Sequence, residues 1–174
     1  MTSKSDSLTA LSLQLGAGLT SPRENWIWGG GLGVAFSWRL LQAHASASVW
    51  TPLHVSGQGY DLRAQLTTAR IGLGVRYPMP RLRLEGGADM GIGLRVVVED
   101  RRGAGIPRGR HWYASPSLQS RLHAVWPADS VFAAELAVLA ERFYSHQVFL
   151  VGGEPVLNLG RWMVRTTLGL RWAL

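Results

Sequence analysis

Along nearly the whole chain, apolar residues alternate with small or polar ones, and this pattern strongly limits the possible folds. It is clearest between Trp162 and Leu174, where each even-numbered residue is apolar or threonine and the odd-numbered ones include two arginines and a glycine. Successive side chains of a β-strand point to opposite faces, so a period of two predicts a strand with one apolar face. A chain built from such segments is expected to be all-β.

Eight segments show this pattern, and one of them is ambiguous. In residues 130–144, Phe132, Leu136, Leu139 and Phe143 also form a helical stripe that follows a possible cap at Asp129. An even number of strands favours the strand interpretation of this segment. The predicted strands are residues 11–19, 26–40, 41–51, 69–77, 82–96, 112–126, 130–144 and 162–174.

The connections between these strands alternate in length. Those near residues 40–41, 78–80 and 127–129 are tight, whereas those at 21–25, 52–61, 100–108 and 145–160 are mostly longer and polar. Short turns at one end and long loops at the other are typical of an outer-membrane barrel. The expected fold is an eight-stranded antiparallel up-and-down transmembrane β-barrel over residues 7–174, after a flexible segment at residues 1–6.

The non-apolar face is made mostly of glycine, alanine and serine. Because an eight-stranded barrel has an interior only just wide enough for side chains, these small residues are expected inside and the apolar ones outside. A soluble ligand-binding barrel, with the apolar face inward, is the alternative.

Tryptophan spacing supports the membrane interpretation. Trp28 and Trp38 are ten residues apart on one predicted face, as are Trp162 and Trp172. Ten tilted strand residues rise roughly 25 Å, the height of the apolar band between two aromatic girdles. Trp50 falls on the polar face and has no assigned role. The predicted girdle residues are Trp26, Trp28, Trp38, Trp112, Trp126, Trp162 and Trp172.

The C-terminus carries a family resemblance. Thr167, Gly169, Trp172 and Leu174 resemble the terminal signal by which outer-membrane barrels are recognised for assembly, with leucine in place of the usual final aromatic residue. From about residue 7 to residue 174 the chain resembles small eight-stranded outer-membrane barrels of the OmpA-domain and OmpX type. This resemblance implies a Gram-negative outer membrane, a leader already removed, and contacts with outer-membrane lipid, lipopolysaccharide and the assembly machinery.

Charged residues of both signs fall on the predicted inner face. Buried charges must be paired, so an arginine–carboxylate network is expected to fill and plug the lumen. Glu85 and Asp89 are expected beside arginines of the two adjacent strands, and Glu135 and Glu141 beside Arg121, Arg165 and Arg171. A small ion or solute channel is the alternative. The predicted network comprises Arg70, Arg76, Glu85, Asp89, Arg121, Glu135, Glu141, Arg165 and Arg171.

A second group of arginines lies at the long-loop end. Guanidinium groups suit bidentate phosphate contacts, so Arg101, Arg102, Arg108 and Arg110 are candidate lipopolysaccharide contacts, with a solvated loop as the alternative. The long loops are also the expected place for a protein partner. The net charge of +7 does not indicate nucleic-acid binding, because the arginines are dispersed through apolar segments.

Few features of the chain suggest catalysis. With no cysteine, thiolate metal sites and disulfides are excluded, and no metal or cofactor is expected. The glycines at 29–33 lack dinucleotide-loop spacing. Histidine and serine neighbours such as His54 and Ser56 match no recognisable triad, so a lipid A-modifying enzyme is a minor alternative. A structural or interaction role, in envelope integrity or as a loop-presenting anchor, is the favoured function.

Overall fold

The computed structural model describes residues 7–20, 25–57, 59–103, 109–151 and 154–174, and almost all of them lie in strands. In this part of the chain no helix is long and apolar enough to cross a membrane. The elements are β1 (Ser7–Thr20), β2 (Asn25–Trp38), β3 (Leu41–Trp50), β4 (Leu53–Gly57), β5 (Tyr60–Met79), the short 3₁₀ helix η1 (Pro80–Leu82), β6 (Leu84–Gly103), β7 (Gly109–Trp126), β8 (Phe132–Phe143), β9 (Val148–Val151), β10 (Glu154–Asn158) and β11 (Trp162–Ala173).

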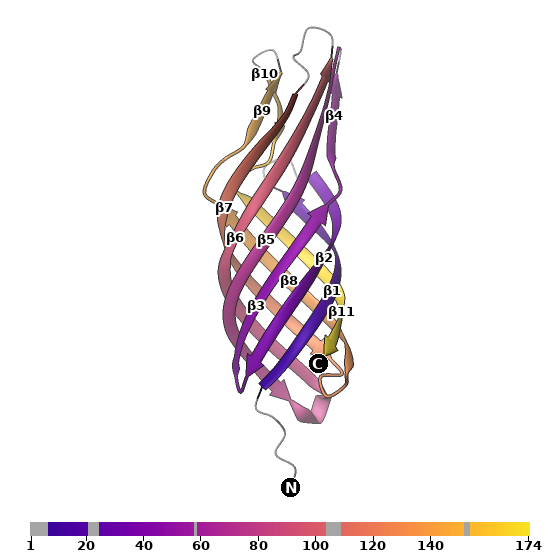
Figure 1. Cartoon of the computed structure of the whole chain (residues 1–174), viewed down its shortest axis with the longest axis vertical. Coiled ribbons are helices and arrows are strands. Elements are labelled where there is room, and N and C mark those ends of the chain that lie inside the picture. Colours follow the sequence, from indigo (N-terminus) through magenta and orange to yellow (C-terminus); the bar gives the residue numbers. More distant parts are fainter. Residues whose placement is uncertain (1–6, 21–24, 58, 104–108, 152–153) are drawn as a thin grey trace.

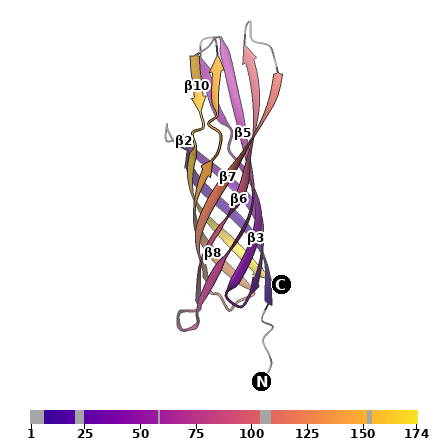
Figure 2. The same ribbon diagram turned by 90° about the vertical axis from the view of Figure 1, so that its left-hand side faces the viewer.

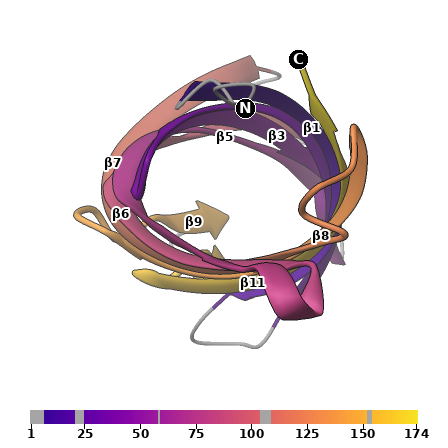
Figure 3. The same cartoon turned by 90° about the horizontal axis from the view of Figure 1, so that it is seen from below.

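Eight of these strands form a closed antiparallel barrel (Figure 1). The order β3-β2-β1-β11-β8-β7-β6-β5 is closed by pairing of β3 with β5, which gives the ring seen along the barrel axis in Figure 3. The predicted eight-stranded fold is confirmed. The helical alternative for residues 130–144 is wrong, because β8 pairs with both β7 and β11.

The two ends of the barrel differ. The start of β1, the C-terminus and η1 lie at the short-turn end, whereas β5, β6 and β7 continue past the other barrel strands at the long-loop end (Figures 1 and 2). There β4 pairs with the upper part of β5, and β9 and β10 form a separate hairpin. The segments 52–61, 100–108 and 145–160 were expected to be loops, and this expectation is wrong for their described residues, which are largely strand. We call β4, the upper parts of β5, β6 and β7, and the β9–β10 hairpin the extension.

The barrel wall is apolar outside and mostly small or polar inside. Leu73 and Met90 have 72% and 73% of their surface exposed, although both are large apolar residues. Their neighbours Gly72, Gly74 and Gly91 face the lumen, where side chains from adjacent strands cover them. The predicted direction of the two faces is confirmed, and the soluble alternative with an apolar interior is wrong for this part of the chain.

Neighbouring glycines at the start of β6 provide a direct test of lumen packing. A Cβ added to Gly87 would collide with the His123 ring and lie 2.8 Å from the Val75 carbonyl oxygen. We therefore expect Gly87→Ala to lower the free energy of unfolding by about 1–3 kcal/mol through overpacking. Urea unfolding of the detergent-refolded protein, followed by tryptophan fluorescence, measures this change.

The adjacent Gly86 is the matched control. Its added Cβ would point the other way and approach only the flexible end of Met79, at 3.3 Å. Gly86→Ala is expected to change stability by less than about 0.5 kcal/mol, as surface substitutions usually do. Equal losses for the two variants would contradict the assignment of Gly87 to a filled lumen.

At the long-loop end the apolar side chains point into the barrel instead of outward. On β5, Leu62, Ala64 and Leu66 are fully buried inside, while Arg63 points outward and is exposed. Below them the apolar residues of the same strand, from Ile71 to Tyr77, point outward. The apolar side chains of β5 therefore point inward in the extension and outward in the barrel wall, because the extension has an apolar interior of its own.

Candidate functional site: a charged lumen beneath an apolar plug

An apolar cluster fills the interior at the long-loop end. It draws side chains from β2, β3, β5, β6, β8, β9, β10 and β11 and from the segment after β10, so chain regions far apart in sequence meet there. Tyr113 packs edge-on against Phe149, with ring centroids 5.4 Å apart. We call this cluster the plug; its members are Ile27, Trp50, Leu62, Ala64, Leu66, Val97, Phe143, Phe149, Leu157, Leu159 and Met163.

Arg95 ties the plug to the barrel wall. Its guanidinium lies 3.7 Å from the centre of the Phe143 ring and donates hydrogen bonds to the carbonyl oxygens of Leu159 and Gly160, at 3.4 and 3.5 Å. The segment that follows β10 is thereby attached to β6. The cation–π contact and the two charge-assisted hydrogen bonds together offset the free-energy cost of burying this arginine.

The first layer of charge below the plug is centred on Glu141. Its carboxylate pairs with Arg165 and accepts a 2.5 Å hydrogen bond from the Ser117 hydroxyl. Arg165 also donates to the Thr68 hydroxyl at 3.0 Å and lies 5.0 Å from the centre of the Trp50 ring. Trp50, which the alternation left without a role, is therefore a plug residue in contact with a lumen arginine.

The second layer is centred on Asp89. Arg121 donates to Asp89 at 3.1 Å and also pairs with Glu135, so one guanidinium bridges two carboxylates. His44 and His123 lie on either side of Asp89, with Nδ1 to carboxylate oxygen distances of 3.5 and 3.6 Å. All five side chains are buried.

The third layer lies near the short-turn end. Glu85 accepts hydrogen bonds from Arg76 at 3.0 Å and from Arg171 at 2.9 Å. Arg171 was expected beside Glu135 or Glu141, on the adjacent β8. It reaches across the lumen to β6 instead, because a barrel brings non-adjacent strands within reach of a long side chain.

Arg70 is the exception among the predicted network residues. Its side chain is buried, yet no described residue forms an ion pair or hydrogen bond with it, and its Nε is among the buried atoms without a partner. The other predicted residues are brought into the three layers just described. Nothing in the sequence distinguishes Arg70 from Arg76, because both occupy lumen-facing positions on one strand.

The seven predicted girdle tryptophans all point outward, with between 47% and 68% of their surface exposed. Trp38, Trp126 and Trp172 lie at strand ends near the short turns. Trp26, Trp28, Trp112 and Trp162 lie toward the opposite ends of the same strands. In the proposed assembly signal, Trp172 and Leu174 are exposed, while Thr167 and Gly169 are partly covered. Their membrane and assembly roles stay predictions.

The four candidate phosphate contacts separate into different environments. Arg101 hydrogen-bonds to the buried Glu99, which raises the pKa of its guanidinium above the ordinary value. Arg102 points outward and donates to Asp100 at 3.0 Å, and Arg110 is exposed. Arg108 lies outside the described residues.

The histidine and serine neighbours also have distinct surroundings. His54 contacts Asp61 on the outer face of the extension, and His146 contacts Asn158 at 2.6 Å. His44 is in the lumen, so Ser46 and His44 are not at an exposed rim. Among the described residues no serine donates to a histidine, so a serine–histidine pair is not assembled in this part of the chain.

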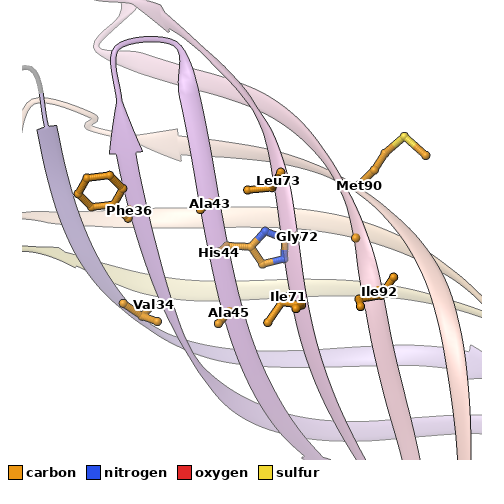
Figure 4. Close-up of a pocket in the computed structure, with 11 residues that line it drawn as sticks. Val34, Phe36, Ala43, His44, Ala45, Ile71, Gly72, Leu73, Met90 and Ile92 are labelled. Atoms are coloured by element: carbon orange, nitrogen blue, oxygen red, sulfur yellow. The ribbon is translucent and has the colours of Figure 1, made fainter.

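A shallow apolar groove of about 600 Å³ runs along the outer wall over β2, β3, β5 and β6. Ala43 and Ala45 form its floor between larger residues such as Phe36 and Leu73 (Figure 4). His44 reaches the inner side of this wall, with its ring beside Gly72. The composition of the groove is that of a lipid-facing surface, and no charged side chain lines the groove.

No protein-family model and no curated protein sequence matches this chain significantly. Solved structures do match it. Neisserial surface protein A superposes with a TM-score of 0.67 at 7% identity, over 97% of each chain. The fold is that of the small outer-membrane barrels.

Two further structures share this architecture. A major outer membrane protein from Thermus thermophilus matches with a TM-score of 0.68 at 12% identity, over 95% of this chain and 99% of its own. Ail, the attachment invasion locus protein of Yersinia pestis, solved with the heparin analogue sucrose octasulfate, matches with a TM-score of 0.61 at 9% identity over 97% of both chains. Such low identities show a shared fold and carry no partner or ligand over to this chain.

Proposed function

We propose that the protein is a non-conducting barrel of the bacterial outer membrane with a structural or interaction role, in which the barrel anchors the extension outside the membrane. The plug is the observation that carries this proposal. The plug side chains are between 0% and 4% exposed and come from most of the strands at the long-loop end of the barrel. A channel would need a continuous polar path through the long-loop end of the barrel. Packed apolar side chains of the plug occupy that position instead.

The outer surface of the extension supports the second half of the proposal. Arg63 lies opposite Asp100 in the β5–β6 ladder, and Asp61 lies opposite Arg102. This surface is charged, unlike the apolar wall below it, and so is suited to water. By analogy with barrels that have short periplasmic turns, the extension lies on the extracellular side.

Conductance recording tests the plugged lumen. We expect protein inserted into planar lipid bilayers to give no steady open level, because the apolar plug excludes hydrated ions. Phe149→Ser combined with Leu157→Ser loosens the hairpin half of the plug and is expected to produce transient openings. A heat-dependent gel shift confirms folding of each sample, and a steady open level from the unchanged protein would refute the proposal.

We also propose that the outward arginines of the extension contact phosphate groups of lipopolysaccharide. Arg110 and Arg102 are the candidates that point outward, and Arg63 adds a third exposed guanidinium on the same side of the extension. Arg102 is paired with Asp100, whereas Arg110 and Arg63 have no ion pair among the described residues. Guanidinium–phosphate pairs are bidentate and stronger than neutral hydrogen bonds.

Binding to lipopolysaccharide-containing vesicles tests these contacts. The double variant Arg63→Ser, Arg110→Ser is expected to reduce association by about thirtyfold, since two charge-assisted contacts of about 1 kcal/mol each are lost. The control Arg101→Ser removes an arginine that is bonded to Glu99 and should leave association unchanged. Equal binding by the double variant would mean that these arginines only keep the extension soluble.

A further inference from the structure

A small chamber lies in the lumen beside Arg70. Its free volume is about 20 Å³, enough for one or two water-sized particles. On one side it is lined by small and neutral polar residues of β1, β2 and β3, among them Ser12 and Gln42. On the other side it is lined by Arg70, Arg121 and Arg171. The chamber is therefore a small polar site.

Positive charge exceeds negative charge around this chamber. Glu135 is the carboxylate that lines it, and Arg121 already pairs with Glu135 as well as with Asp89. Arg171 forms an ion pair with Glu85. Arg70 adds a further guanidinium that has no ion pair among the described residues. A buried guanidinium without an ion pair is costly, so a compensating anion is favoured at this place.

The free hydrogen-bonding groups also match an anion. The Nε of Arg70 and the Nη2 of Arg171 are buried N–H donors with no hydrogen-bond partner in the described part of the chain. Both residues line the chamber. Unpaired buried donors are costly, and an anion placed between two guanidinium groups would accept from both.

We propose that this chamber binds one small monovalent anion of the size and charge of chloride, held by Arg70 and Arg171. The small free volume favours a single small ion over phosphate, sulfate and organic acids, and the surrounding guanidinium groups favour an anion over a cation. The bound anion completes the charge balance of the lumen and stabilises the barrel. This site is separate from the plug and the extension, so it does not depend on the function proposed above.

Thermal unfolding in matched salts tests the anion site. The detergent-refolded protein is heated in sodium chloride or in sodium gluconate at equal ionic strength, and unfolding is followed by the heat-dependent gel shift. Chloride is expected to raise the midpoint by about 3 °C over gluconate, because a ligand that binds only the folded state stabilises it. Gluconate is too large for the chamber and serves as the reference.

Two arginine variants separate a bound anion from a general salt effect. Arg70→Met should lose the chloride-dependent shift and be no less stable than the unchanged protein in gluconate, because it removes a buried guanidinium that has no ion pair among the described residues. Arg76→Met, a lumen arginine on the same strand that does not line the chamber, should keep the shift. The same shift in all three proteins, or none in the unchanged protein, would overturn the proposal.

Bromide provides a measurement that does not depend on folding of any variant. Crystals of the unchanged protein grown in sodium bromide should show an anomalous difference peak in the chamber between Arg70 and Arg171. A chamber with no anomalous peak, and with electron density explained by water, would reject the site even if Arg70→Met fails to fold.

Discussion

Arg121→Met is expected to lower the free energy of unfolding by about 3–5 kcal/mol, the cost of breaking a buried ion pair by removing one partner. Arg121 donates to Asp89 at 3.1 Å and pairs with Glu135, so its loss leaves two buried carboxylates without their guanidinium. Methionine keeps most of the side-chain volume, which isolates the effect of charge. Urea unfolding followed by tryptophan fluorescence measures the difference.

Two further variants make this prediction specific. Arg76→Met is the control, because Glu85 keeps Arg171 as its partner and the expected loss is only about 1 kcal/mol. Adding Asp89→Asn and Glu135→Gln to Arg121→Met should recover much of the stability, since no unpaired carboxylate remains. If Arg121→Met and Arg76→Met cost the same, Arg121 is not the bridging cation that the geometry indicates.

Phe143→Ala is expected to cost about 3–5 kcal/mol, as is usual for removing a buried aromatic side chain. Phe143 is a plug residue with 1% of its surface exposed, and the Arg95 guanidinium lies 3.7 Å from the centre of its ring. Its removal both opens a cavity and takes a cation–π contact from a buried arginine. The same unfolding measurement reports the loss.

The adjacent aromatic residue provides the comparison. Tyr144 is 65% exposed on the opposite side of the chain, and Tyr144→Ala is expected to cost about 1 kcal/mol or less. The two variants remove similar rings at neighbouring positions, so the difference between them measures burial in the plug. A small loss for Phe143→Ala would show that the long-loop end is loosely packed and would weaken the case for a non-conducting barrel.

The plug was missed from the sequence although a signal for it exists. On β5 the apolar residues change from even positions, Leu62 to Leu66, to odd positions, Ile71 to Tyr77. Such a change of phase within one strand marks the level at which the apolar face passes from the inside to the outside. The polar residues around Pro52 and Asp61 suggested a loop, which concealed the upper half of this pattern.

The amino-acid pattern alone predicts the eight strands of the barrel wall and the direction of their faces, but it misses the strands of the extension. A period of two defines strands, and an eight-stranded barrel leaves room inside only for the face rich in small residues. The even strand count correctly favours a strand for segment 130–144, because an up-and-down barrel with antiparallel pairs throughout needs an even number of strands.

Which charged side chains pair with one another follows from the closed barrel and cannot be read from the alternation. Alternation places Arg70, Arg76 and Arg171 in the lumen, but it contains no information about contacts across the barrel. Closure of the sheet by β3 and β5 brings Arg171 of β11 to Glu85 of β6, and it leaves Arg70 beside a chamber instead of a carboxylate. The face of a strand is a local property, whereas charge pairing depends on strand order and stagger around a closed ring.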